Sequence, residues 1–434
     1  MGAAFGGQYS TDPRYRYTDT ETTLNSRGYT GSARVRYSLD TVDLLSVTAY
    51  KKGTFRSTLD TDATSAPLQS IAYASKSRSF SQEVQALSTS GSRFQWIVGG
   101  FYFRAREAYD PFNIFLSRAL SPTDLTYFSF QRTEAESAFG QGTYEVFPGT
   151  KITAGLRYNT ERKSLDATLV SPTFGNFVVG GPIALSKRFN KLTWRFSIDH
   201  KLARDVLVYA SYNRGFKSGA FNPLDFTPGV QGVEPEVLDA YEVGVKSQFA
   251  DRKVQLNLAG YYYDYKNIQL QRVNTGGGTS QAVLENAASA TLYGIDGDVV
   301  VIPVRGLQIS GGFNLEHTRY DSYAAASGVD VGAGSQVPVV LDFTGKQLLV
   351  APNLTFNVAA SYKLDTGLGS FSCSANYSHS FSFFRIAPGN GQYTRGFGLL
   401  NGSIAFTDER EREIYGRALG PQSYRRAEDR RVCE

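Results

Sequence analysis

Apolar and polar residues alternate with a period of two along most of this 434-residue chain. In the segment 354–362, Leu354, Phe356 and Val358 share one face of an extended strand, and Asn357 lies on the opposite face. The same pattern recurs at 152–159, 192–199, 254–258 and 371–378. A sheet needs this period when its two faces meet different solvents. The pattern predicts an all-β protein with about 16 strands.

The connections between these segments alternate between short turns and long links. Long links are expected, for example, at 52–77 and 320–351. Short turns are expected at Asp40, Ser90 to Ser92, Pro148-Gly149, Ala203-Arg204, Ala250-Asp251, Val304-Arg305, Thr366-Gly367 and Asp408 to Glu411. Transmembrane β-barrels are connected in this way, with short periplasmic turns and long extracellular loops. The spacing therefore predicts an antiparallel transmembrane β-barrel.

A soluble β-sandwich also alternates, so the period alone leaves that alternative open. A sandwich of this length usually divides into domains, and the composition shows no break that marks a linker. Aromatic residues gather near expected strand ends at 101–103, 261–265 and 381–384, as in the interfacial girdle of a membrane barrel. The alternative is that these aromatic residues reflect strand propensity alone. The barrel is the preferred interpretation.

Composition argues against several other classes of protein. The net charge of +5 is too small and too dispersed for a nucleic-acid-binding protein. Two cysteines form neither a disulfide framework nor a metal spacing, and three histidines lie on separate segments without a zinc-binding pattern. No constellation suggests catalysis. We therefore predict no metal site, no cofactor and no enzyme activity.

Residues 206–222 (VLVYASYNRGFKSGAFN) and 233–248 (VEPEVLDAYEVGVKSQ) closely resemble the TonB-dependent outer-membrane receptor family. Further segments that resemble barrel strands of this family are 80–87, 94–102, 151–159 and 285–298. The likeness extends from about Arg34 to about Phe406. Such receptors are plugged barrels of about 22 strands that import scarce ligands such as ferric siderophores. The resemblance implies a location in the bacterial cell outer membrane, with lipid and a small-molecule ligand as partners.

The resemblance also predicts how the chain divides. Residues 1–31 are expected to be irregular, residues 32–407 to form the receptor barrel portion, and residues 408–434 to hold a partial strand and an aberrant charged tail. With about 16 strands, the barrel is expected to be incomplete relative to the family's about 22. The plug domain, the box that pairs with TonB and the last strand are expected to be missing. We hypothesise a reading-frame change near Asp408, which sequencing of the genomic locus tests.

The segment 106–132 is predicted to be an outer loop suited to a ring-bearing, negatively charged ligand, because aromatic and cationic side chains mix there. Its candidate ligand-binding residues are Tyr109, Phe112, Phe115 and Arg118. The alternative is that these aromatic residues pack the outer loops against one another.

The Arg-Gly-Phe motif is the second candidate site. The resemblance places its strand so that it rises to the outer face, which brings Arg214, Phe216 and Lys217 near the outer mouth. The alternative is that the cations are rim charges and that the glycines of the motif permit close packing.

The sequence thus favours an outer-membrane receptor barrel for TonB-dependent uptake of a ligand such as a ferric siderophore, in a truncated form unable to transport actively. A passive outer-membrane pore or a surface structural β-protein is the alternative.

Overall fold

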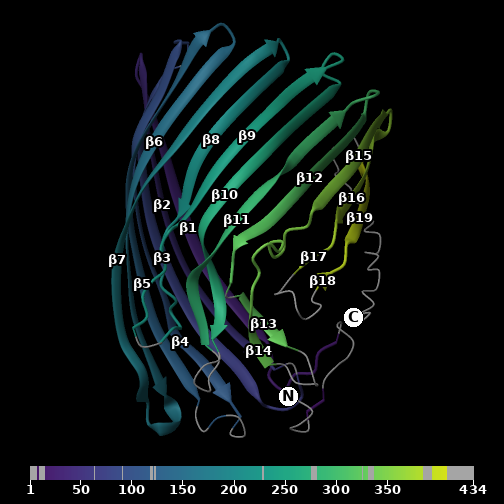
Figure 1. Ribbon diagram of the computed structural model, residues 1–434. Coiled ribbons are helices and arrows are strands. Elements are labelled where there is room, and N and C mark those ends of the chain that lie inside the picture. The colour runs from purple at the N-terminus through teal and green to yellow at the C-terminus, as the bar shows by residue number, and fades with distance from the viewer. Residues whose placement is uncertain are drawn as a thin grey trace.

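In a computed structural model, fifteen strands form one antiparallel sheet that wraps around a hollow (Figure 1). The structure describes residues 7–8, 15–62, 64–89, 91–117, 121, 124–226, 229–274, 281–324, 326–330, 337–384 and 393–407. The strands of this sheet are β1 (Thr23–Ser38), β2 (Val42–Asp60), β3 (Gln69–Ser88), β4 (Phe94–Leu116), β5 (Leu125–Phe147), β6 (Thr150–Ser171), β7 (Phe177–Ala203), β8 (Val206–Lys217), β9 (Glu236–Phe249), β10 (Val254–Asn274), β11 (Gln281–Val301), β12 (Leu307–Ser322), β15 (Leu354–Thr366), β16 (Gly369–Ser380) and β19 (Phe397–Thr407). The predicted all-β barrel fold is confirmed.

Each strand pairs with its neighbours in the chain, so the sheet is a continuous meander. Two small hairpins lie within the links, one formed by β13 (Ala326–Asp330) and β14 (Val337–Leu341), the other by β17 (Phe383–Phe384) and β18 (Tyr393–Thr394). A 3-10 turn, η2 (Pro172–Phe174), precedes β7. Strands β1 and β19 end the sheet, and no pairing joins them within the described residues. No described helix is long and apolar enough to cross a membrane.

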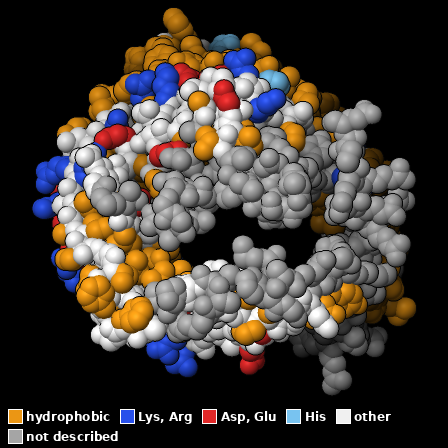
Figure 2. All heavy atoms as spheres, turned by 60° about the horizontal axis from the view of Figure 1, so that its bottom comes forward, with side chains coloured by type: hydrophobic (Ala, Val, Ile, Leu, Met, Phe, Trp, Pro, Cys, Tyr) orange, Lys and Arg blue, Asp and Glu red, His pale blue; other side chains and the backbone are white. Residues whose placement is uncertain are grey.

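The alternation of the sequence places apolar side chains on the outer face of the sheet. Leu156, Val243 and Ile404 are 58%, 61% and 63% exposed on three different strands. Figure 2, which views the molecule from the loop side, shows hydrophobic side chains along the outer circumference. The opposite face carries polar residues such as Asn257 and Glu316 and lines the hollow. One face therefore meets lipid and the other meets water, as in a transmembrane barrel.

An aromatic girdle crosses five neighbouring strands on the outer face. Tyr212, Tyr241, Tyr262, Tyr293 and His317 occupy directly opposed positions from β8 to β12. The rings of Tyr212 and Tyr241 stack with centroids 4.6 Å apart. Amphipathic rings at this level are typical of a membrane interface. Of the residues predicted for a girdle at 261–265, Tyr262 belongs to this one, whereas Tyr261 and Tyr263 have the opposite parity and face the hollow.

The strands are longer than the about 10 residues that a tilted strand needs to cross a bilayer. The predicted long link at 52–77 was wrong in its extent, because β2 continues to Asp60 and β3 begins at Gln69. Likewise β4 and β5 occupy most of the predicted loop 106–132. On the loop side of the girdle these residues continue to pair, so the wall extends past the membrane at that end.

The short turns lie where the sequence predicts them, except that Asp408 to Glu411 lie outside the described residues. All of them are at one end of the sheet, at the top of Figure 1. The first strand begins at Thr23, within the segment 1–31 expected to be irregular, because residues 23–38 pair continuously with β2. The predicted tail 408–434 also lies outside the described residues.

Candidate functional site

A row of aromatic side chains lines the inner wall at the loop end of the sheet. We call these residues the aromatic row: Phe55, Tyr73, Tyr109, Phe112, Tyr127 and Phe226. Neighbouring ring centroids are 5.4 to 6.0 Å apart. Because the row crosses β2, β3, β4 and β5, it forms an apolar strip around part of the mouth.

A bulge in β4 explains how two nearby residues of this strand join the same row. The register shifts between Tyr109 and Phe112, so that Tyr109 faces Ser129 while Phe112 faces Tyr127 on β5. Without the shift, residues three apart in a strand would point to opposite faces. The bulge therefore turns both rings inward, 5.5 Å apart in an edge-to-face arrangement.

The link between β8 and β9, residues 218–235, folds over the inner face of β6 and β7. Its Phe221 is 7% exposed and packs with Leu165 and Ala167, which are buried on β6. Its Phe226 reaches Tyr127, with ring centroids 5.6 Å apart. The link therefore narrows the mouth and completes the aromatic row.

Glu236 fixes the base of this link. Its carboxylate is 2% exposed and accepts hydrogen bonds from Lys217 Nζ at 3.0 Å, from the backbone N–H of Gln269 at 2.7 Å and from the Tyr265 hydroxyl. The Gln269 side chain donates in turn to the carbonyl oxygens of Ser218 and Glu234, both at 2.9 Å. The two ends of the link are thus tied to β10.

We expect Glu236→Ala to weaken the attachment of the 218–235 link to β10. The substitution leaves the buried N–H of Gln269 without its acceptor, which costs about 1–3 kcal/mol. Amide exchange of Gln269 should accelerate roughly 5- to 150-fold in hydrogen-exchange measurements. Lys217→Ala is the matched control, because its exposed ammonium contributes about 0–1 kcal/mol. Equal acceleration in both variants would contradict this role of Glu236.

A cavity of about 370 Å³ adjoins the aromatic row. Hydroxyl, amide and carboxylate groups of the inner wall surround it together with Tyr109, and the 218–235 link contributes a proline; the lining includes Ser75, Ser77, Glu107, Tyr109, Ser129, Gln131 and Pro223. Aromatic faces beside hydrogen-bonding groups suit a small ligand that carries both rings and oxygen atoms.

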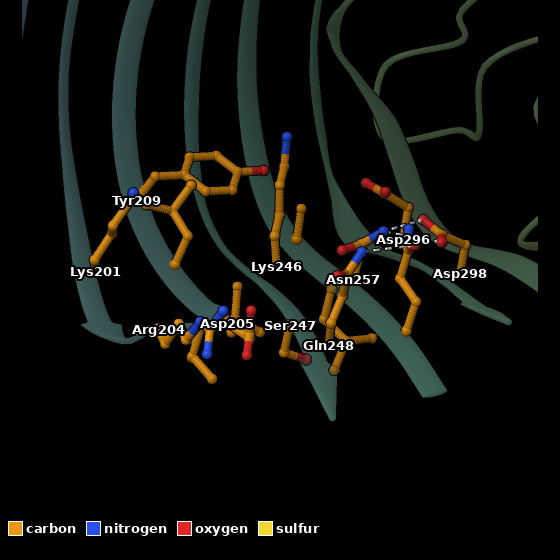
Figure 3. A pocket seen from close by; sticks show the side chains of 16 residues that line it. Lys201, Arg204, Asp205, Tyr209, Lys246, Ser247, Gln248, Asn257, Asp296 and Asp298 are labelled. Atoms are coloured by element: carbon orange, nitrogen blue, oxygen red, sulfur yellow. Dashed lines mark hydrogen bonds between the residues drawn. The ribbon is translucent and has the colours of Figure 1, made fainter. Parts of the chain in front are cut away.

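A second, charged pocket of about 690 Å³ lies on the inner wall at the short-turn end (Figure 3). Figure 3 shows Lys246 of β9 and Tyr209 of β8 extending into it, with Asp296 and Asp298 on β11. The amide of Asn257 donates to a carboxylate oxygen of Asp298 at 3.0 Å. This pocket has one aromatic ring, that of Tyr209, whereas six rings form the aromatic row, so the mouth is the better candidate for a ring-bearing ligand.

Two of the four residues predicted in segment 106–132 lie in the aromatic row. Tyr109 and Phe112 do so, although they belong to strand β4 and not to a loop. Phe115 lies further along β4 and is 45% exposed. Arg118 lies outside the described residues.

The structure separates the three residues predicted from the Arg-Gly-Phe motif. Arg214 shares the outer face with the girdle residue Tyr212, where it pairs with Asp239 and lies 4.3 Å from the Trp194 ring centroid. Phe216 has the same parity in β8 and so points outward. Lys217 points inward and is engaged by Glu236. Of this motif, only Lys217 adjoins the mouth.

Tyr127 lies within the predicted segment 106–132, and sequence reasoning missed the other three members of the aromatic row. Phe55 and Tyr73 lie in the segment predicted to be a long link, yet each has the parity of the polar, inward residues of its strand. If the period of two had been continued from each strand into the predicted link, it would have identified both residues as inward-facing. Phe226 comes from an irregular link, and no periodic signal marks its inward position.

Three carboxylates gather near the start of the 61–68 link, where Asp19, Asp60 and Asp62 have oxygen atoms within 4.8 Å of one another. Internal donors already occupy these oxygens, including Arg16 on Asp60 at 3.2 Å and the backbone N–H of Gln69 on Asp62 at 2.7 Å. These hydrogen bonds therefore hold the two ends of the 61–68 link together.

Comparison with known proteins supports this architecture. The model of a protein family described as TonB dependent receptor-like, beta-barrel, matches residues 1–413. Among solved structures, the ferric yersiniabactin uptake receptor FyuA from Yersinia pestis is 16% identical, with a TM-score of 0.70 over 89% of this chain and 54% of that one. The siderophore receptor PiuA from Acinetobacter baumannii is 13% identical, with a TM-score of 0.70 over 94% and 63%.

A copper transporter, OprC, has the same fold at 13% identity, with a TM-score of 0.67 over 89% of this chain and 58% of that one. At such identities the likeness shows the fold and not the ligand. The chain spans between 54% and 63% of the length of these three proteins.

Proposed function

This chain belongs to the TonB-dependent receptor family of the bacterial outer membrane, and we propose that its mouth binds a small, ring-bearing ligand of the siderophore type. Binding at the aromatic row is the first step of uptake in this proposal. TonB-driven passage through a receptor that includes this barrel portion is part of the same proposal.

The observation that carries the proposal is the aromatic row beside a polar cavity on the inner wall. The rings of Tyr73 and Phe112 stack with an interplanar angle of 27°, which leaves a flat apolar surface along the wall. A ligand ring packs against such a surface, while its oxygen atoms meet Ser77 and Gln131 in the cavity. The similar structures are a ferric yersiniabactin uptake receptor, FyuA, and a siderophore receptor, PiuA, which supports this class of ligand.

Titration of the chain in lipid nanodiscs with a panel of ferric catecholate, phenolate and hydroxamate siderophores tests the proposal. We expect saturable binding of at least one ring-bearing member. Phe112→Ala should weaken it about two- to tenfold, since an aromatic pair contributes about 0.5–1.5 kcal/mol beyond its buried area. Tyr241→Ala is the control, because this ring is on the lipid face. Failure of the whole panel to bind, or equal loss in both variants, would refute the proposal.

The hollow of the sheet supports a second candidate function, a passive pore. Figure 2 shows an opening at the centre of the loop-side view. Single-channel conductance separates the candidates, because a pore passes ions without any ligand and a receptor need not.

A further inference from the structure

One carboxylate of the cavity beside the aromatic row has no partner. Glu107 lies on the inward-facing side of β4, two residues before Tyr109, and its register partners are Ser77 on β3 and Gln131 on β5. All four residues line the cavity, and Glu107 is exposed. Within the described residues, Glu107 forms no ion pair and no hydrogen bond. Its carboxylate is therefore available to a group of a bound ligand.

Neighbouring cations do not neutralise this charge. Lys76 is the other charged residue that lines the cavity, but it belongs to the outward-facing set of β3 and pairs with Asp110 at 2.8 Å. Lys51 faces inward on β2, two strands away, and forms no ion pair with Glu107 in the described part of the chain. The cavity therefore presents a negative charge to the hollow.

The cations that led us to predict a negatively charged ligand lie on the other face of the wall. Arg106 and Arg132 are directly opposite each other on β4 and β5. Each is adjacent in sequence to an inward-facing residue, Glu107 or Gln131, so each points outward. Arg118 lies outside the described residues. Neither described cation of the segment 106–132 therefore supports an anionic ligand at the mouth.

The rings beside Glu107 favour a cation as well. Tyr73, Tyr109 and Phe112 have ring centroids 5.4 to 6.0 Å apart. The face of an aromatic ring carries negative electrostatic potential and attracts ammonium groups. Burial, together with Tyr73 and Glu107, raises the pKa of Tyr109, so its hydroxyl stays neutral. Rings and carboxylate together suit a positively charged group.

We propose that Glu107 selects ligands that carry a protonated amine on a short arm beside their ring. The ligand ring packs against Tyr73 and Phe112, and its ammonium group donates to the carboxylate of Glu107. Inward-facing residues that follow each other in a strand are about 7 Å apart, which suits an arm of a few atoms. This inference rests on the proposed function, because it requires that the aromatic row binds the ring.

Three gallium complexes that share a catechol ring and differ in the arm test the proposal. Dopamine has an aminoethyl arm, ethylcatechol a neutral ethyl arm and dihydrocaffeic acid a carboxyethyl arm; gallium replaces iron because it is redox-inert. Each is titrated into the full chain in lipid nanodiscs by calorimetry. The dopamine complex should bind at least about fivefold more tightly than the dihydrocaffeic acid complex. The preference should shrink as salt is added, because the carboxylate is exposed.

Glu107→Gln should abolish this preference and leave binding of the ethylcatechol complex as in the parent protein. Glu161→Gln is the matched control, because it removes an inward-facing carboxylate that already pairs with Lys163 at 3.0 Å. It should retain the preference. If the three complexes bind equally well to the parent, or if both variants lose the preference alike, Glu107 does not select the ligand, although the ring-binding proposal stands. If none of the three complexes binds, the aromatic row does not hold a ring and both proposals fail.

Discussion

Val358→Arg is expected to lower the free energy of unfolding by about 2–4 kcal/mol, the cost of a cation on the lipid face near the bilayer midplane. Val358 is 48% exposed and lies on the apolar face of β15, opposite Gly311 and Tyr377. Urea unfolding in lipid vesicles, followed by tryptophan fluorescence, measures the change.

The adjacent residue provides the control. Asn357 is also exposed, but its parity turns it toward the hollow, where water solvates a guanidinium group. Asn357→Arg should therefore change the free energy of unfolding by less than about 1 kcal/mol. If both variants lose the same stability, the face assigned to lipid is not in contact with lipid, and the membrane assignment fails.

Phe221→Ala is expected to release the 218–235 link from the inner wall. Truncating a buried phenylalanine costs about 3–5 kcal/mol, because the ring's contacts with Leu165 and Ala167 are lost and a cavity remains. The free energy of opening the link should fall by this amount. Hydrogen exchange of its amides, read by mass spectrometry, should accelerate by two orders of magnitude or more.

Phe174→Ala is a matched truncation in another link, where the ring is 61% exposed. It should leave exchange in residues 218–235 unchanged. Phe221→Ala should also weaken siderophore binding if the mouth acts as proposed, since Phe226 belongs to the same link. Unchanged exchange in Phe221→Ala would show that the link is not held by this ring.

The period of two, together with the alternation of short turns and long links, was sufficient to predict the fold and its two faces. Hydrogen-bonded strands must alternate, so Val358 and Asn357 are assigned to opposite solvents by counting alone. The short turns were equally predictable, because Gly149 and Gly306 occupy backbone conformations with positive φ that favour glycine. Both signals depend only on residues close to one another in the chain, so they can be recognised in a single sequence.

The site was only partly predictable. The run 261–263 reads as one aromatic patch, yet Tyr262 faces lipid while Tyr261 faces the hollow and donates a hydrogen bond to Asn314 at 2.9 Å. Arg214 was expected at the mouth, although its parity with Tyr212 already assigns it to the outer face. Phe226 reaches the wall through tertiary packing, which periodicity does not encode.

The wall that rises above the membrane has a consequence for how such receptors diversify. Tyr73 and Phe112 are side chains of paired strands, so under the proposed function exchanging them alters what the mouth recognises while the backbone stays in register. New recognition is then reached by single replacements at every second position, without insertions or remodelled loops. Two chains with superimposable scaffolds can accordingly diverge in cargo through a handful of inward-pointing substitutions.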